Sequence, residues 1–112
     1  MPTWYYRYIS YPAEVTQVQD ERKVLSTNPT NGHLTWYAPE RYHIPRDAER
    51  ALALPSAPTH RMGALPDAMM PSFAIPHRVV NPRYGHPGGG IEVATRHPVW
   101  LSGLWDYSRW LL

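Results

Sequence analysis

The sequence has no cysteine, a single phenylalanine and no long apolar run among its 112 residues. Without cysteine the chain forms no disulfide and no thiolate metal site, as is typical of a protein that works in a reducing cytosol. No apolar segment approaches the roughly 20 residues that a membrane-spanning helix needs. The opening letters MPTWYYRY also lack the apolar core of a signal peptide. We therefore expect no membrane association, and delivery as the tip of a larger exported polypeptide stays open.

Several common catalytic and binding motifs are also missing. The six histidines show neither the H-x-x-x-H nor the H-x-H spacing of a metal site, so we expect no metal. The absence of a G-x-S-x-G stretch argues against a serine hydrolase. The run Gly88–Gly90 is followed neither by Lys-Ser/Thr nor by a predicted helix, which argues against a P-loop and a dinucleotide fingerprint. The formal net charge of +2 is too small for a nucleic-acid-binding tail, although RVVNPRYGHP interleaves basic and aromatic residues.

Proline and the polar aromatic residues are abundant instead, with 13 prolines, 8 tyrosines and 5 tryptophans. The prolines interrupt helices and favour short strands joined by fixed turns. Tyrosine and tryptophan combine a large apolar ring with a polar group, which suits clefts and interfaces. The length predicts a single domain over residues 1–112, long enough to bury a core.

The pattern along the chain predicts an α+β fold with two short helices followed by a mostly β second half. The expected strands span residues 3–10, 33–40, 59–65, 77–82 and 91–95, and the expected helices span residues 11–22 and 44–55. Residues 66–76 are expected to form a proline-rich connection, with Met69, Met70 and Phe73 tucked beneath it. We expect the tryptophan-rich tail to pack back on the sheet.

Strand alternation separates the candidate site residues by face. In the second strand Trp36 and Tyr37 point to opposite faces, so only one of them can line a cleft. Thr35 shares a face with Tyr37, which favours Tyr37. In the late strand Glu92 points away from its two apolar neighbours, and two interpretations remain open: a solvated surface charge or a carboxylate held in a site. Arg7 is an unusual residue in a strand as aromatic as YYRYIS.

Three segments taken together, YYRYIS, LTWYAPERYHIPRDAERAL and PGGGIEV, resemble the ADP-ribosyltransferase superfamily in their order and spacing. In that family an Arg or His lies on the first strand, an aromatic strand precedes a helix, and a Glu lies on a late strand. The stretch GHPGGGIEV is also similar to the NAD glycohydrolases of the tuberculosis-necrotizing-toxin type, which have Gln at the position of Glu92. The resemblance implies an ADP-ribosyltransferase-like split β-sheet.

The resemblance also implies roles for individual residues. Glu92 would stabilise the oxocarbenium-like state of nicotinamide–ribose cleavage and bond the 2′-hydroxyl of NAD. Arg7 would hold the diphosphate. Tyr37, with Trp36 as the alternative, would stack on the nicotinamide ring, and Thr35 would bond the carboxamide or the ribose.

The glycine run is given a supporting role. Gly89 and Gly90 would let the backbone approach NAD closely, and His86 adjoins this loop. Many family members that modify arginine carry a second acid two residues before the catalytic Glu. Gly90 occupies that place here, which argues against arginine as the acceptor.

The sequence thus leads to the expectation of an NAD-dependent mono-ADP-ribosyltransferase, acting as an antibacterial toxin domain delivered into the cytoplasm of a target cell. Its expected partners are NAD as co-substrate, a macromolecular acceptor, with protein favoured over nucleic acid, and a cognate immunity protein. One alternative is an NAD glycohydrolase with water as the acceptor. A second alternative is a non-catalytic module that binds nucleic acid or protein through its basic and aromatic surface.

Overall fold

A computed structural model describes residues 4–24, 34–69, 73–96, 98–107 and 111, and the predicted α+β class is confirmed. Three short helices and several small antiparallel sheets make up the described part of the chain. The elements in chain order are β1 (Tyr5–Ile9), α1 (Pro12–Glu21), β2 (Lys23–Val24), β3 (Thr35–Tyr37), α2 (Pro45–Ala51), β4 (His60–Ala64), α3 (Pro66–Met69), β5 (Phe73–Val79), β6 (Ile91–Thr95), β7 (Val99–Trp100) and β8 (Gly103–Trp105).

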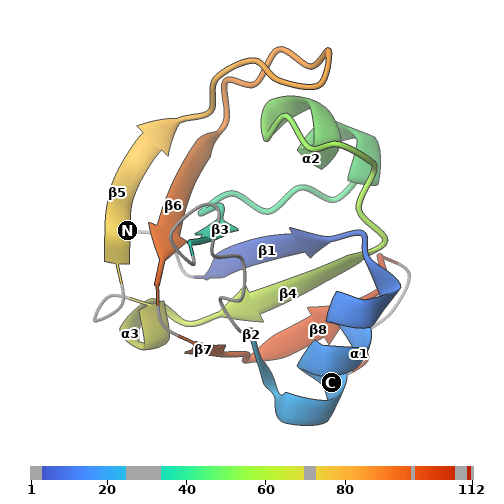
Figure 1. The fold of residues 1–112 in the computed structure, drawn as a ribbon, viewed down its shortest axis with the longest axis vertical. Helices are drawn as coiled ribbons and strands as arrows, with labels where there is room; N and C mark the ends of the chain where they lie inside the picture. The colour runs from blue at the N-terminus through green and yellow to red at the C-terminus, as the bar shows by residue number, and fades with distance from the viewer. Residues whose placement is uncertain (1–3, 25–33, 70–72, 97, 108–110, 112) are drawn as a thin grey trace.

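Two three-stranded sheets form the framework, one in the order β1-β4-β8 and the other in the order β3-β6-β5. Figure 1 shows β5 and β6 rising along one side of the molecule while β1, β4 and β8 run across it. The two sheets meet where β1 and the end of β3 form an isolated bridge. Tyr6 and Ala38 exchange two backbone hydrogen bonds of 2.8 Å there. A small sheet of β2 and β7 completes the arrangement.

Proline starts both longer helices, as the sequence predicts. Pro12 and Pro45 lie in the first turn, where a missing N–H costs nothing because that group has no partner within the helix. Helix α1 ends at Glu21, and the capping residue Arg22 has a φ of 59°, in the left-handed region typical of a helix end. Its apolar stripe, Val15 and Val18, is buried. No helix in the described part of the chain is long and apolar enough to span a membrane.

The two faces of β1 contribute to two separate apolar clusters. Tyr5 and Ile9 belong to the main core, and Tyr6 and Tyr8 belong to a smaller cluster that includes residues of α2. The main core joins side chains of most elements (Tyr5, Ile9, Val15, Val18, Val24, Tyr37, Met62, Ala64, Met69, Val93, Val99 and Leu104). Alternation places Arg7 on the face of Tyr5 and Ile9, and its neighbour Tyr6 makes the bridge that joins the two sheets.

Some elements differ from the prediction. The region expected to be a plain connection contains α3, and its Met69 is fully buried in the main core with Phe73 packed against it. Met70 lies outside the described residues. Strand β5 begins at Phe73, earlier than predicted, and tolerates Pro76 because it lies at the edge of its sheet. The tail packs back on the sheet as expected, since β8 pairs with β4.

Buried tyrosines predict a loss of stability at alkaline pH. Burial is the largest cause that raises the pKa of Tyr8, Tyr37 and Tyr107 above the ordinary value of 10.0. In the unfolded chain these hydroxyls lose their protons near pH 10, whereas the folded protein holds them to higher pH. This contribution to the free energy of unfolding is therefore fully present below about pH 10 and falls as the pH rises further.

An alkaline titration that follows tyrosinate absorbance and circular dichroism together checks this expectation. Part of the tyrosinate signal should appear only as the folded dichroism signal is lost. In Tyr107→Phe the late-titrating fraction should shrink, because the hydroxyl removed is buried and has no hydrogen-bond partner among the described residues. Complete titration near pH 10 with the fold intact would contradict the prediction.

Candidate functional site

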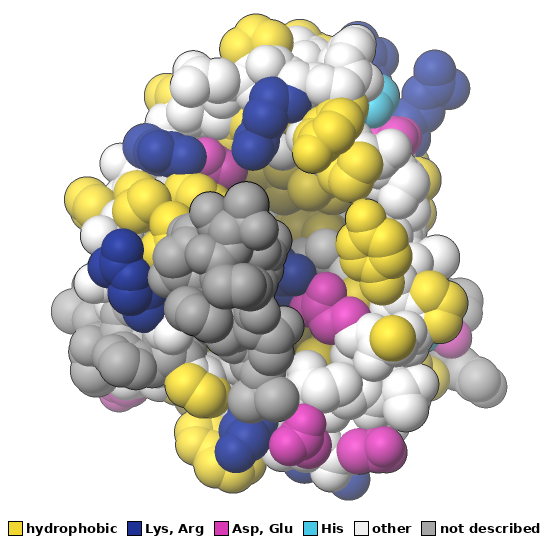
Figure 2. Space-filling view, viewed as in Figure 1, with side chains coloured by type: hydrophobic (Ala, Val, Ile, Leu, Met, Phe, Trp, Pro, Cys, Tyr) yellow, Lys and Arg dark blue, Asp and Glu magenta, His cyan; other side chains and the backbone are white. Residues whose placement is uncertain are grey.

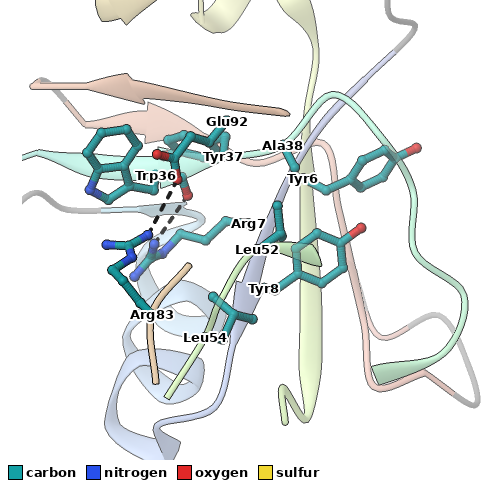
Figure 3. A pocket seen from close by; sticks show the side chains of 10 residues that line it. All are labelled: Tyr6, Arg7, Tyr8, Trp36, Tyr37, Ala38, Leu52, Leu54, Arg83 and Glu92. Atoms are coloured by element: carbon teal, nitrogen blue, oxygen red, sulfur yellow. Dashed lines mark hydrogen bonds and ion pairs between the residues drawn. The ribbon is translucent and has the colours of Figure 1, made fainter. Parts of the chain in front are cut away.

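A cavity of about 70 Å³ lies where the two sheets meet. Its lining residues come from β1, from β3 and the residue after it, from the segment after α2, and from the β5–β6 region (Tyr6, Arg7, Tyr8, Trp36, Tyr37, Ala38, Leu52, Leu54, Arg83 and Glu92; Figure 3). It brings together Arg7, Trp36, Tyr37 and Glu92, four residues that the sequence analysis singled out. Figure 2 shows the molecule hollowed on this face, with hydrophobic side chains inside and charged ones at the rim.

Glu92 is the carboxylate of this site, and it is buried. Its exposed fraction is only 5%, so it is not a solvated surface charge. The register of β5 and β6 places Arg78 directly opposite, and the Arg78 Nε donates a hydrogen bond of 3.0 Å to Glu92 Oε2. Arg83 Nη2 lies 3.7 Å from Oε1, and Figure 3 shows this guanidinium facing the carboxylate. Two arginines thus compensate one buried negative charge.

Trp36 and Tyr37 lie on opposite faces of β3, as alternation requires. Trp36 is paired with Ala94, on the same face as Glu92, whereas Tyr37 is paired with Val93 on the face of the main core. Tyr37 is 2% exposed, so little of its ring is available to a ligand even though it contributes to the cavity wall. The structure therefore favours Trp36 over Tyr37 as a stacking residue.

Thr35 shares a face with Tyr37, as the sequence predicted, but that face is directed to the core and not to the cleft. It is buried, it is paired with Thr95 across the strands, and it is not among the residues that line the cavity. The face shared by Thr35 and Tyr37 was the reason for preferring Tyr37 from the sequence. The structure shows that this shared face is directed to the core.

The side chain of Arg7 lines the cavity and forms an ion pair with Glu14. Its guanidinium makes two hydrogen bonds to Glu14 of α1, from Nε to Oε2 at 2.5 Å and from Nη2 to Oε1 at 2.9 Å. A third bond, from Nη1 to the Trp36 carbonyl at 3.3 Å, ties Arg7 to β3. Burial acts to lower the pKa of Arg7, but the hydrogen bond and charge of Glu14 raise it above its ordinary value. An anion that binds the Nε–Nη2 edge of Arg7 must therefore displace Glu14.

Sequence reasoning missed Glu14 as part of the site. The only signal available was its position in the first turn of the helix that follows β1, seven residues after Arg7. Because α1 folds back beside the strand it follows, an acid at its start can meet an arginine on that strand. Arg78, the second missed residue, follows from the β5–β6 pairing and not from any local pattern.

The glycine run supports the fold and does not line the cavity. The amides of Gly88 and Gly90 donate to the carbonyls of Arg50 and Ala51 at 3.0 Å each, and that of Gly89 donates to the Val80 carbonyl at 3.0 Å. The Arg50 and Ala51 carbonyls belong to the last turn of α2, and that of Arg50 also accepts a longer bond of 3.4 Å from the Ala53 amide. All three amides are therefore engaged, and none is left to bind phosphate.

Gly90 is required by close packing. A Cβ at this position would lie 2.7 Å from the Tyr42 hydroxyl oxygen and 3.0 Å from the Ala51 carbonyl oxygen. The space that the sequence analysis assigned to an approaching ligand is thus filled by the protein itself. Gly90 leads directly into β6, so this packing fixes the start of the strand that carries Glu92.

His86 lies away from the Glu92 cavity. It ends a tight turn that starts at Arg83, in which Tyr84 and Gly85 both have positive φ and the end residues exchange backbone hydrogen bonds of 2.8 and 3.2 Å. The His86 Nε2 is 3.3 Å from Oε2 of Glu49 on α2. His86 borders a separate, open hollow with Arg46 and Arg50.

Neither a metal-binding group of side chains in the described ranges nor a similar known protein adds to this description of the site. No group of three or more His, Cys, Asp or Glu side chains that could hold a metal ion is found within the described ranges. Comparisons with protein-family models, curated proteins and solved structures found no match to this chain. What the fold and the site define is an α+β domain with a cavity lined by Arg7, Trp36, Arg83 and the buried Glu92, where Arg78 pairs with Glu92 and lies on the Trp36 ring.

Proposed function

We propose that the chain is an NAD-dependent mono-ADP-ribosyltransferase of the bacterial toxin type. The observation that carries the proposal is the meeting of Arg7, Trp36 and Glu92 in one cavity, although they lie far apart in the sequence. They come from β1, from the aromatic strand that precedes α2, and from a late strand, which is the order that the resemblance implies. Two sheets joined by a single bridge are also compatible with a split β-sheet of that superfamily.

The electrostatics of the cavity suit an anionic ligand. Arg7 and Glu14 neutralise each other, whereas Glu92 faces the two arginines Arg78 and Arg83. One positive charge is therefore left over beside the carboxylate. A diphosphate placed at the rim would find bidentate donors in the half-exposed Arg83 and, after exchange with Glu14, in Arg7.

In the proposed reaction Glu92 acts on the ribose. As the bond to nicotinamide breaks, positive charge develops on the ribose, and a fixed carboxylate stabilises it without having to reorganise. Trp36 would hold the nicotinamide ring by stacking. Nicotinamide leaves as a neutral molecule, so this scheme needs no general acid. Productive binding requires the cavity to open, because ligand sites typically measure about 300–1,000 Å³.

The second candidate is the glycohydrolase, in which water accepts the ADP-ribose. It is favoured by Gly90, whose side-chain space is filled by Tyr42 and the end of α2. A second acid for a protein acceptor therefore has no room at that position. Action in the cytoplasm of a target cell and a cognate immunity protein belong to the proposal under either acceptor.

Purified protein incubated with NAD tests the proposal. Release of nicotinamide is expected, and the fate of the ADP-ribose then separates the candidates. Rapid NAD consumption with no macromolecule present identifies the glycohydrolase. Labelling of a protein band in a bacterial lysate by biotinylated NAD identifies the transferase. No release of nicotinamide under either condition would rule out both enzymes and leave the binding module.

A further inference from the structure

The guanidinium of Arg78 occupies a position defined by two residues of the candidate site. Its Cζ lies 4.4 Å from the centre of the Trp36 ring, and its Nε donates to Glu92 Oε2 at 3.0 Å. Arg78 reaches this position from β5, across β6, to the indole on β3. A planar cation with an N–H donor in its plane thus lies on an aromatic face and against a buried carboxylate.

We propose that Arg78 is an internal competitor for this position, so that the site selects planar cations able to displace it. Trp36 provides a face that attracts cations, and Glu92 needs a positive partner because it is 5% exposed. A planar cationic ring with an in-plane amide donor can stack on Trp36 and donate to the Glu92 carboxylate, as Arg78 does now. A neutral ring satisfies Trp36 alone and leaves Glu92 without the partner that Arg78 provided.

The exposure of Arg78 allows a ligand cation to displace it. Its side chain is 48% exposed, so it can return to water without crossing the protein interior. An arginine with this exposure is held by a surface-type ion pair and one cation–π contact, each of which is weak. Arg83, the other arginine beside Glu92, is about equally exposed, and among the described residues the cation on the Trp36 ring is Arg78. Removal of Arg83 changes the charge around Glu92 without uncovering Trp36.

The chemical class that the site selects includes the pyridinium ring of oxidised nicotinamide nucleotides. For that ligand the inference rests on the proposed function, whereas the binding of a free planar cation does not. The suitable probe is 1-methylnicotinamide, which is cationic, and nicotinamide is its neutral control. The two share the ring and the carboxamide and differ in charge.

Binding of the two probes to wild type, Arg78→Ala and Arg83→Ala, followed by NMR at the Trp36 indole, tests the inference. Arg78→Ala should bind 1-methylnicotinamide about tenfold more tightly than wild type, the value expected for removing one weak ion pair and one stacked competitor. Arg83→Ala should gain clearly less, and neither variant should gain as much for nicotinamide. Adding Glu92→Gln to Arg78→Ala should remove the preference for the cation.

An unchanged affinity of Arg78→Ala, or an equal gain for both probes, overturns the inference. The thermal transition of Arg78→Ala checks that the fold is kept. The outcome is separable from the proposed function. If 1-methylnicotinamide binds with this pattern but NAD is not cleaved, only the proposed function fails. If NAD is cleaved and Arg78→Ala leaves both the affinity for the cation and the KM for NAD unchanged, only the inference fails.

Discussion

Replacing Glu92 by glutamine should lower the rate of NAD cleavage by about 10²–10³-fold, the cost typical of removing one preorganised group that stabilises transition-state charge. The amide has nearly the shape of the carboxylate but carries no charge to oppose the positive charge that develops on the ribose. Because Trp36 and Arg7 remain, NAD should still bind. The loss should therefore appear mainly in kcat.

The fold should survive this substitution. Arg78 and Arg83 are both half exposed, so losing their partner returns them to water and does not bury an unpaired charge. The free energy of unfolding should fall by about 1 kcal/mol at most, as for other partly exposed ion pairs. Denaturant unfolding of the variant measures this change in the free energy of unfolding separately from activity.

The matched control is Glu21→Gln, which makes the same chemical change at an exposed position near the end of α1. It should cleave NAD at the wild-type rate. Expression in bacteria gives a second measurement, in which wild type should slow growth and Glu92→Gln should not. If Glu92→Gln retained the wild-type rate of cleavage, Glu92 would not be the catalytic carboxylate.

The regular elements could be predicted because their signals are local. Pro12 and Pro45 mark helix starts, and alternation marks β1, β3 and β6. The short strands β2, β7 and β8 carry no such signal, because two or three residues become a strand only through a distant partner. Lys23 pairs with Trp100, and Met62 pairs with Leu104. Pairings over such distances depend on the whole fold.

The site could be predicted only in part for the same reason. Alternation correctly separated Trp36 from Tyr37, but with an aromatic residue on each face it could not indicate which face is the core. The Arg78–Glu92 pair depends on the register of β5 and β6, which shifts twice along their length. The contact between Arg7 and Glu14 depends on how α1 packs beside β1. Alternation left Glu92 open between a surface charge and a site carboxylate, the resemblance singled it out, and the fold determined its partners.

Gly88→Ala should lower the free energy of unfolding by about 3–4 kcal/mol, because two penalties combine at one residue. Its φ of +69° lies in the left-handed region, which alanine occupies at a cost. Its Cβ would also lie 2.5 Å from the Val80 carbonyl oxygen, a contact that backbone must move to relieve. That carbonyl accepts the Gly89 amide, so the movement also weakens a hydrogen bond of the loop.

Gly89→Ala separates the two penalties. Its φ of +98° is also left-handed, but no atom lies within 4 Å of the Cβ it would carry. The cost should therefore be the conformational one alone, about 1–2 kcal/mol. Chemical denaturation of both variants and wild type measures the difference. Equal destabilisation by the two variants would contradict the steric explanation.

Gly88→Ala and Gly89→Ala also test whether the glycine run affects the candidate site. The run from Gly88 to Gly90 joins the last turn of α2 to the start of β6, and β6 carries Glu92. A shift of the backbone at Gly88 should therefore move the carboxylate at the start of β6 relative to Trp36, which pairs with Ala94 farther along the same strand. Folded Gly88→Ala should cleave NAD more slowly than folded Gly89→Ala, measured well below their unfolding temperatures. The glycines would then act on the reaction by positioning Glu92, without any contact with phosphate.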